Sequence, residues 1–236
     1  MKVNWTRQAR FAAVALGALL AASQAARSEA PEIGEVVQRN YRGATAEGPD
    51  PAHPIYFANT VHAQELVKTG LKGSTELEFL DATRLVVGPN GEVRLDDFVY
   101  DPASASGGGQ ISLKVGAFRY QSGELKNKEN VKLVTPTATM TIRGTHLVIF
   151  VDGDGATEVN VIEGAVDVLA CNAPSAVSAG AGQRVNVTTG CATTVADLRP
   201  MPRDHVPSMP GTTDLPAGAD SPDGPDESPH SEPEPD

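Results

Sequence analysis

Apolar and polar residues alternate over most of this chain, and glycine-containing breaks interrupt the alternation about every 8–12 residues. Such alternation is typical of half-buried β-strands, because successive side chains of a strand point to opposite faces. The segment 147–151 is apolar on both faces, which predicts a central strand that is covered on both sides. Only the window 32–40 offers a helical pattern. The alternation is clearest at residues 76–79, 83–87, 93–95, 111–115, 131–133, 159–161, 166–168 and 185–187.

The breaks consist of residues that favour turns. Asn90 and Gly91 are an example, because both residues tolerate the positive φ that a tight turn requires. The pattern predicts an all-β fold with a single domain of paired β-sheets. A sandwich and a short solenoid-like stack both remain open at this point. The other turn signals are Gly73, Gly107 to Gly109, Gly116, Gly123, Gly144, Asp152 to Gly155, Gly164, Gly182 and Gly190.

The two ends of the chain differ from this body. Residues 1–26 have a positive start, a twelve-residue apolar stretch and a small-residue cleavage pattern, which together predict a secretory signal peptide. The apolar stretch is short for a membrane anchor, which needs about 20 residues. We therefore expect a periplasmic or secreted protein with no membrane span after signal cleavage.

Residues 200–236 hold ten of the 18 prolines and nine acidic residues against one basic residue. Such a segment buries too little apolar surface to offset the entropy of ordering it, so we predict a disordered acidic tail. The predicted organisation is a signal peptide at 1–26, a lead-in segment at 27–54, the β domain at 55–199 and the tail at 200–236.

Charge and motifs exclude several function classes. The formal net charge of −11 argues against nucleic acid as the partner, since phosphate binding requires clustered Lys and Arg. The five histidines do not pair at ligand spacing, and residues 152–163 match a calcium loop only in part, so a hairpin turn is the expected structure there. Nucleophile and nucleotide-binding motifs are missing from the sequence. We predict a protein that is not an enzyme and that uses no cofactor and no metal.

The two cysteines, Cys171 and Cys191, are 20 residues apart. An exported chain matures in an oxidising compartment, where disulfides form and persist. The glycines and the strand between the two cysteines allow a hairpin that brings the sulfurs together. We predict a disulfide whose loop closure stabilises the fold by roughly 3 kcal/mol.

Several stretches resemble the FecR-domain family, a type of extracytoplasmic domain found in bacterial regulators of ferric-citrate uptake. The most specific stretch reads T-P-x-A-T followed by I-R-G-T, within residues 134–145. Residues 66–70, 77–90, 159–168 and 180–183 also resemble the family. The motif residues, which we expect to be structural, are Thr135, Pro136, Ile142, Arg143, Gly144 and Thr145.

The sequence also departs from the family pattern. Ala82 stands where the family usually has glycine, which predicts a less tight turn. The regulators carry a cytoplasmic segment and a membrane span ahead of this domain, where this sequence has a predicted signal peptide. The resemblance therefore implies an exported β-rich interaction module, and it does not imply control of a sigma factor. Glycine at 144 would allow close backbone approach, while Arg143 could organise the centre of the fold or recognise a ligand.

Two functions remain in view. The leading hypothesis is a non-enzymatic module that contacts an envelope protein in signalling or envelope organisation, with addition of a strand to an exposed sheet edge as a natural binding mode. The alternative is a carbohydrate-associated envelope protein, structural or hydrolytic. Trp5 lies in the predicted signal peptide and is the only tryptophan, so the remaining chain has no indole to stack on a sugar ring.

Overall fold

The computed structural model describes residues 30–39, 43–48 and 51–198 of the chain. The predicted signal peptide and the predicted disordered tail lie outside these residues. The all-β prediction is confirmed, since the described regular structure consists of strands and one 3-10 helix of three residues. Among the described residues, no helix has the length and apolar character needed to cross a bilayer.

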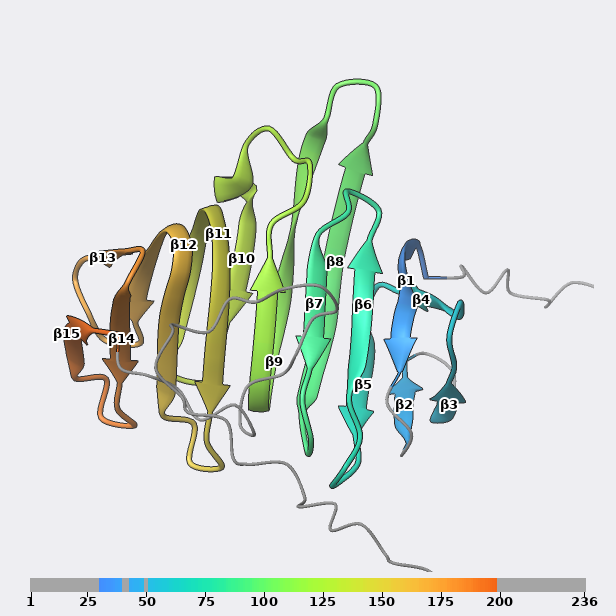
Figure 1. Ribbon diagram of the computed structural model, residues 1–236, viewed down its shortest axis with the longest axis horizontal. Helices are drawn as coiled ribbons and strands as arrows, with labels where there is room; N and C mark the ends of the chain where they lie inside the picture. Colours follow the sequence, from blue (N-terminus) through green and yellow to red (C-terminus); the bar gives the residue numbers. More distant parts are fainter. Residues whose placement is uncertain (1–29, 40–42, 49–50, 199–236) are drawn as a thin grey trace, which may run out of the picture. The chain divides into compact units, whose positions relative to one another are not determined.

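The described strands all join one continuous hydrogen-bonded sheet in the compact unit that begins at Pro31 (Figure 1). In chain order the elements are β1 (Glu32–Arg39), β2 (Ala44–Glu47), β3 (His53–Ile55), β4 (Thr60–His62), β5 (Glu65–Thr69), β6 (Thr75–Phe79), β7 (Arg84–Val87), β8 (Glu92–Asp101), β9 (Ser106–Gln121), η1 (Lys128–Asn130), β10 (Val131–Val134), β11 (Ala138–Val151), β12 (Thr157–Ala170), β13 (Val177–Gly180), β14 (Gln183–Val187) and β15 (Thr193–Asp197).

Three long strands, β9, β11 and β12, bend and divide this sheet into two layers. We call layer A the series β4, β1, β6, β7, the second halves of β9 and β11, the first half of β12, β14 and β15. Layer B is the series β3, β2, β5, β8, the first half of β9, β10, the first half of β11, the second half of β12 and β13. The structure is therefore a pair of layers that share their longest strands.

The hydrophobic core lies between the two layers. Layer A directs Leu77, Leu85 and Ile149 into it, and layer B directs Val93 and Leu133 into it, all of them fully buried. The predicted central strand at 147–151 is confirmed: it forms the second half of β11, between β9 and β12, and most of its side chains are buried on both faces.

Glycines at positive φ mark the bends in the long strands. Gly116 lies in β9 with φ 120°, Gly144 in β11 with φ 70° and Gly164 in β12 with φ 76°. We expected these three glycines in turns between strands, and that expectation was wrong, because the strands continue through them. A residue with a side chain rarely adopts such a φ, so glycine permits the change of layer without ending the strand.

The segment 107–109 was also expected to be a turn, but it lies inside β9. The hairpin turn comes earlier, at residues 102–105. Glycine is required at these positions because neighbouring backbone lies too close to leave space for a side chain. A Cβ on Gly107 would lie 2.0 Å from the carbonyl oxygen of Val99, and one on Gly108 would lie 2.7 Å from the carbonyl oxygen of Asn130.

The window 32–40, which alone offered a helical pattern, contains a strand, because residues 32–39 form β1 between β4 and β6. Register shifts of the β-bulge type occur near both ends of this strand. They allow Ile33 and Val36, three residues apart, to be buried together, which produces a helix-like spacing in a strand. β1 and β2 lie in the segment 27–54 that we expected to lead into the domain, and both pair with strands of the same sheet.

Candidate functional site

The first half of the family motif forms a buried cluster of hydroxyl groups. Thr135 lies in the turn between β10 and β11, where its Oγ1 accepts a hydrogen bond from the N–H of Ala138 at 3.0 Å. Thr157 Oγ1 donates to Thr135 Oγ1 at 2.8 Å, and Thr137 Oγ1 donates to the carbonyl oxygen of Gly155 at 2.9 Å. Pro136 packs beside Gly155 in the next hairpin turn. This half of the motif fastens two turns together, and the hydroxyl groups of Thr135 and Thr137 are buried in the process.

The Asp152 turn between β11 and β12 is the hairpin that we predicted in place of a calcium loop. The carboxylate Oδ1 of Asp152 accepts hydrogen bonds from the N–H groups of Asp154 and Ala156, at 3.1 and 2.8 Å. Among the described residues, no group of three His, Cys, Asp or Glu side chains is placed to hold a metal ion.

The second half of the motif lies at the bend of β11. Ile142 is buried in the core, and the backbone of Thr145 exchanges hydrogen bonds with Ser122 at 3.0 Å. Arg143 is half exposed, and its Nη2 lies 2.5 Å from Asp167 Oδ2 while its Nε lies 3.3 Å from Glu129 Oε1. The structure thus places Arg143 on the outer face of layer B and not at the centre of the fold. The two halves of the motif do not converge on one site.

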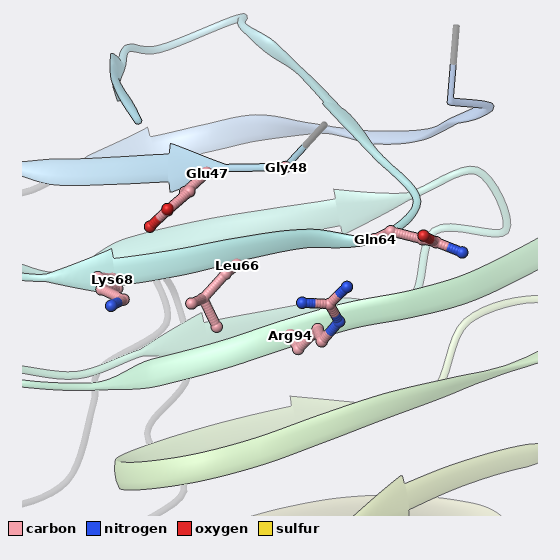
Figure 2. A pocket seen from close by; sticks show the side chains of 6 residues that line it. All are labelled: Glu47, Gly48, Gln64, Leu66, Lys68 and Arg94. Atoms are coloured by element: carbon pink, nitrogen blue, oxygen red, sulfur yellow. The ribbon is translucent and has the colours of Figure 1, made fainter. Parts of the chain in front are cut away.

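A shallow polar cavity of about 550 Å³ lies on the same outer face, beside β2, β5 and β8 (Figure 2). Lys68 and Arg94 reach this face, and each has a carboxylate partner: Lys68 Nζ lies 3.4 Å from Glu92 and Arg94 Nε lies 3.6 Å from Asp96. Sequence reasoning did not find the cavity, because its residues come from three strands, and from the positions next to two of them, that only the register brings together. The cavity is lined by Glu47, Gly48, Gln64, Leu66, Lys68 and Arg94.

Asp81 organises the turn between β6 and β7 from a fully buried position. Its two carboxylate oxygens accept hydrogen bonds from the N–H and the hydroxyl of Thr83, both at 2.9 Å. Thr83 Oγ1 in turn accepts from the N–H of Gly123 at 2.9 Å. Tyr120 lies close by, and burial raises the pKa of its phenol. This network joins the β6–β7 turn to the segment after β9.

Ala82, in the same turn, adopts the left-handed conformation with φ 61°. The turn is tight, contrary to expectation: the N–H of Ala82 donates to Phe79 at 2.9 Å, and the N–H of Phe79 donates to Thr83 at 2.8 Å. Alanine therefore accepts a conformation that costs a non-glycine residue about 1–2 kcal/mol.

Ala82→Gly is expected to stabilise the protein by about 0.5–1 kcal/mol, because relief of the left-handed cost outweighs the extra chain entropy of glycine. Urea denaturation measures the change. Ala103→Gly is the matched control, since Ala103 is exposed in the β8–β9 turn and has no positive φ. It should lower the free energy of unfolding, and an equal response of both variants would contradict the explanation.

The predicted disulfide between Cys171 and Cys191 is confirmed, with Cα atoms 5.5 Å apart. Cys171 follows the layer B half of β12, whereas Cys191 lies in the turn between β14 and β15 of layer A. The disulfide therefore joins the end of β12 in layer B to the β14–β15 turn of layer A.

β15 is the outermost strand of layer A and, among the described strands, pairs only with β14. The N–H of Leu198 donates to Gly182 and the N–H of Thr188 donates to Ala192, at the two ends of the β14–β15 ladder. Because hydrogen-bonded and non-hydrogen-bonded pairs alternate along an antiparallel ladder, these two bonds show which β15 residues pair with β14 through their backbone. Thr194 and Ala196 accordingly direct their backbone groups toward β14, and Val195 directs its backbone groups outward. Four of the five β15 residues are exposed, and Val195 is 42% exposed. The other edge strands, β3, β4 and β13, have only three or four residues each.

Comparison with known proteins identifies the central part of this fold. Residues 65–167 match the family model described as FecR protein. Residues 65–167 are a FecR domain. The match begins at Glu65, the first residue of β5, and ends at Asp167, inside β12. β1 to β4 therefore precede the matched part of the FecR domain, and β13 to β15 follow it.

Two crystal structures, at 2.50 and 1.65 Å resolution, are similar to part of this chain. Both are of a protein from Parabacteroides distasonis ATCC 8503 that is described as an anti-sigma factor. The sequence identities are 12% and 11%, and the TM-score is 0.45 for each. The similarity covers 56% of this chain and 59% of the other, so the chain spans less than two thirds of those proteins. No curated protein matches the chain.

Proposed function

We propose that this protein is an exported, non-enzymatic regulatory module that acts through protein contacts, and that the free edge of β15 is its contact site. The FecR domain supports a role in signalling. The Cys171–Cys191 disulfide supports maturation in an oxidising compartment, either the periplasm or the extracellular space. The partner is an envelope protein, and the module requires neither nucleic acid nor a cofactor.

The observation that carries this proposal is the outward-facing backbone of β15. An exposed edge strand presents unpaired N–H and C=O groups that can pair with a strand of another chain. Val195 supplies such a pair of groups together with a partly exposed apolar side chain. The β15 edge is fixed in place by its ladder with β14 and by the disulfide in the turn before it.

Chemical crosslinking in cells, followed by mass spectrometry, tests the proposal. The expected result is reproducible recovery of one envelope protein, with crosslinks near β15. Val195→Pro should abolish these crosslinks and leave the fold intact, because proline removes an outward N–H and is tolerated on edge strands.

Leu71→Ala is the control for Val195→Pro, since Leu71 is 74% exposed in the β5–β6 loop, away from the β15 edge. Its crosslinks should match those of the unchanged protein. Retention on isolated cell wall or polysaccharide, with no protein partner recovered, would overturn the proposal in favour of a carbohydrate-associated protein.

A further inference from the structure

The polar cavity on the outer face of layer B is arranged as a cross around one apolar side chain. Leu66 of β5 lies at its centre and is partly exposed. The register places Glu47 of β2 on one side of Leu66 and Arg94 of β8 on the other. Lys68 follows two residues later along β5 and therefore points to the same face, and Gln64 closes the opposite end. Four polar side chains thus surround an apolar floor (Figure 2).

The charges of the polar cavity are separated by sign. The negative charge of Glu47 lies on the β2 side, and the positive charges of Lys68 and Arg94 lie on the β5 and β8 side. In Figure 2 the Glu47 side chain extends from β2 toward β5, while the Arg94 guanidinium rises from β8 beyond Leu66. The strands β2 and β8 are two strand spacings apart, or about 10 Å at ~4.8 Å each. A ligand in this cavity therefore meets opposite charges at its two ends.

These charged groups are available to a ligand. Arg94 has one ion pair among the described residues, from its Nε to Asp96 at 3.6 Å, which leaves its Nη1 and Nη2 groups for a further partner. Lys68 Nζ has a single ion pair, with Glu92 at 3.4 Å. The side chains of Lys68 and Arg94 are 45% and 43% exposed, and ion pairs between such exposed groups are weak. Glu47 is exposed as well, and no described residue forms an ion pair with it.

The separated charges select the chemistry of the ligand. The guanidinium fork of Arg94 matches the two oxygens of a carboxylate, whereas the carboxylate of Glu47 requires a cation opposite it. A ligand with negative charge only, such as phosphate, is attracted by Arg94 and Lys68 and repelled by Glu47. The cavity volume of about 550 Å³ falls within the range of about 300–1,000 Å³ that small-ligand sites occupy. A peptide with free ends has both an ammonium group and a carboxylate, and three extended residues span about 10 Å.

We propose that the polar cavity binds a short zwitterionic peptide of about three residues, with its ammonium group at Glu47 and its carboxylate at Arg94 and Lys68. The aliphatic side chain of the middle residue covers Leu66, and the Gln64 amide, which both donates and accepts hydrogen bonds, faces the peptide backbone. The site lies on layer B at β2, β5 and β8, whereas the β15 edge belongs to layer A. The peptide site is therefore independent of the proposed contact with an envelope protein.

Titration of the full exported chain with the tripeptide Ala-Leu-Ala, followed by amide NMR shifts, tests the site. The expected result is saturable binding in the millimolar range or tighter, with shifts at Leu66, Lys68 and Arg94. Arg94→Gln should weaken the affinity about 10–100-fold, because hydrogen bonds between charged groups are strong. Lys114→Gln is the matched control, since it removes an exposed positive charge of β9 outside the cavity, and it should leave the affinity unchanged.

Blocked peptides test the orientation of the ligand. Amidation of the carboxyl end should remove the difference in affinity between Arg94→Gln and the unchanged protein, because the peptide then lacks the charge that Arg94 binds. Acetylation of the amino end should likewise remove the smaller difference, about two- to fivefold, that Glu47→Gln causes with the free peptide.

The proposal fails if no saturable shifts occur, if the doubly blocked peptide binds as tightly as the free peptide, or if Arg94→Gln and Lys114→Gln bind the peptide equally. It also fails if acetate displaces the peptide at equal concentration, because the cavity would then hold any carboxylate. Val195→Pro should bind the peptide as the unchanged protein does. Failure of the peptide site and failure of the β15 contact are therefore distinguishable.

Discussion

Gly164→Ala is expected to destabilise the protein by about 2–5 kcal/mol, whereas Gly144→Ala should cost only about 1–2 kcal/mol. The two glycines face each other at the bend where β11 and β12 pass from one layer to the other. Their φ values are nearly equal, 76° at Gly164 and 70° at Gly144. Both substitutions therefore incur the same cost of placing alanine in the left-handed region.

The difference arises from the space around each Cβ. On Gly164 the added atom would lie 2.0 Å from the carbonyl oxygen of Gly144 and 3.1 Å from Cα of Thr145. These are backbone atoms between the ladder pairs Arg143–Ala165 and His146–Glu163, and the backbone of Thr145 is also hydrogen-bonded to Ser122, so they cannot easily move aside. A Cβ on Gly144 would meet nothing within 4 Å. Steric overlap then adds about 1–3 kcal/mol to the conformational cost at Gly164 alone.

Equilibrium denaturation in urea, monitored by circular dichroism, measures both costs. If Gly164→Ala fails to fold, Gly164→Ala in a background stabilised by Ala82→Gly provides the second measurement. Equal losses at the two positions would show that conformation alone sets the requirement for glycine, and would contradict the steric explanation.

The sequence carried enough information to predict the strands from β6 to β12 and β14, but not the shorter strands near the two ends and not the strand pairing. Alternation identified β6, β7, β12 and β14, because a buried face imposes a period of two. Alternation did not reveal that Gly116, Gly144 and Gly164 lie within strands. A glycine at a bend inside a strand interrupts the alternation in the same way as a glycine in a turn between two strands. The bulges of β1 also shifted the spacing of Ile33 and Val36 from two to three.

The candidate site was less predictable than the fold, for a physical reason. The T-P and I-R-G-T motifs are local in sequence, and the structure uses most of them to fasten turns and to bend β11. The polar cavity and the edge of β15 depend on which strands become neighbours. Lys68 and Arg94, for example, are brought together only by the β5–β8 register. A binding surface of this kind leaves no contiguous pattern in the chain.

Replacement of both cysteines, Cys171→Ser with Cys191→Ser, is expected to lower the free energy of unfolding by about 3 kcal/mol. The disulfide closes a loop of 20 residues that contains β13 and β14, so its removal restores entropy to the unfolded chain. Urea denaturation measures the loss, and reduction of the unchanged protein should reproduce it.

The loss should also be local. β15 depends on β14 alone for its described pairing, and β14 is attached to layer A only through the first half of β12. Without the disulfide, β14 and β15 can separate from layer A while the β9–β11 centre stays folded. Hydrogen exchange should therefore accelerate first in β14 and β15, and crosslinks to the β15 edge should weaken under reducing conditions. An even increase of hydrogen exchange over both layers would contradict this prediction, because the disulfide would then stabilise the whole fold and not the β15 edge in particular.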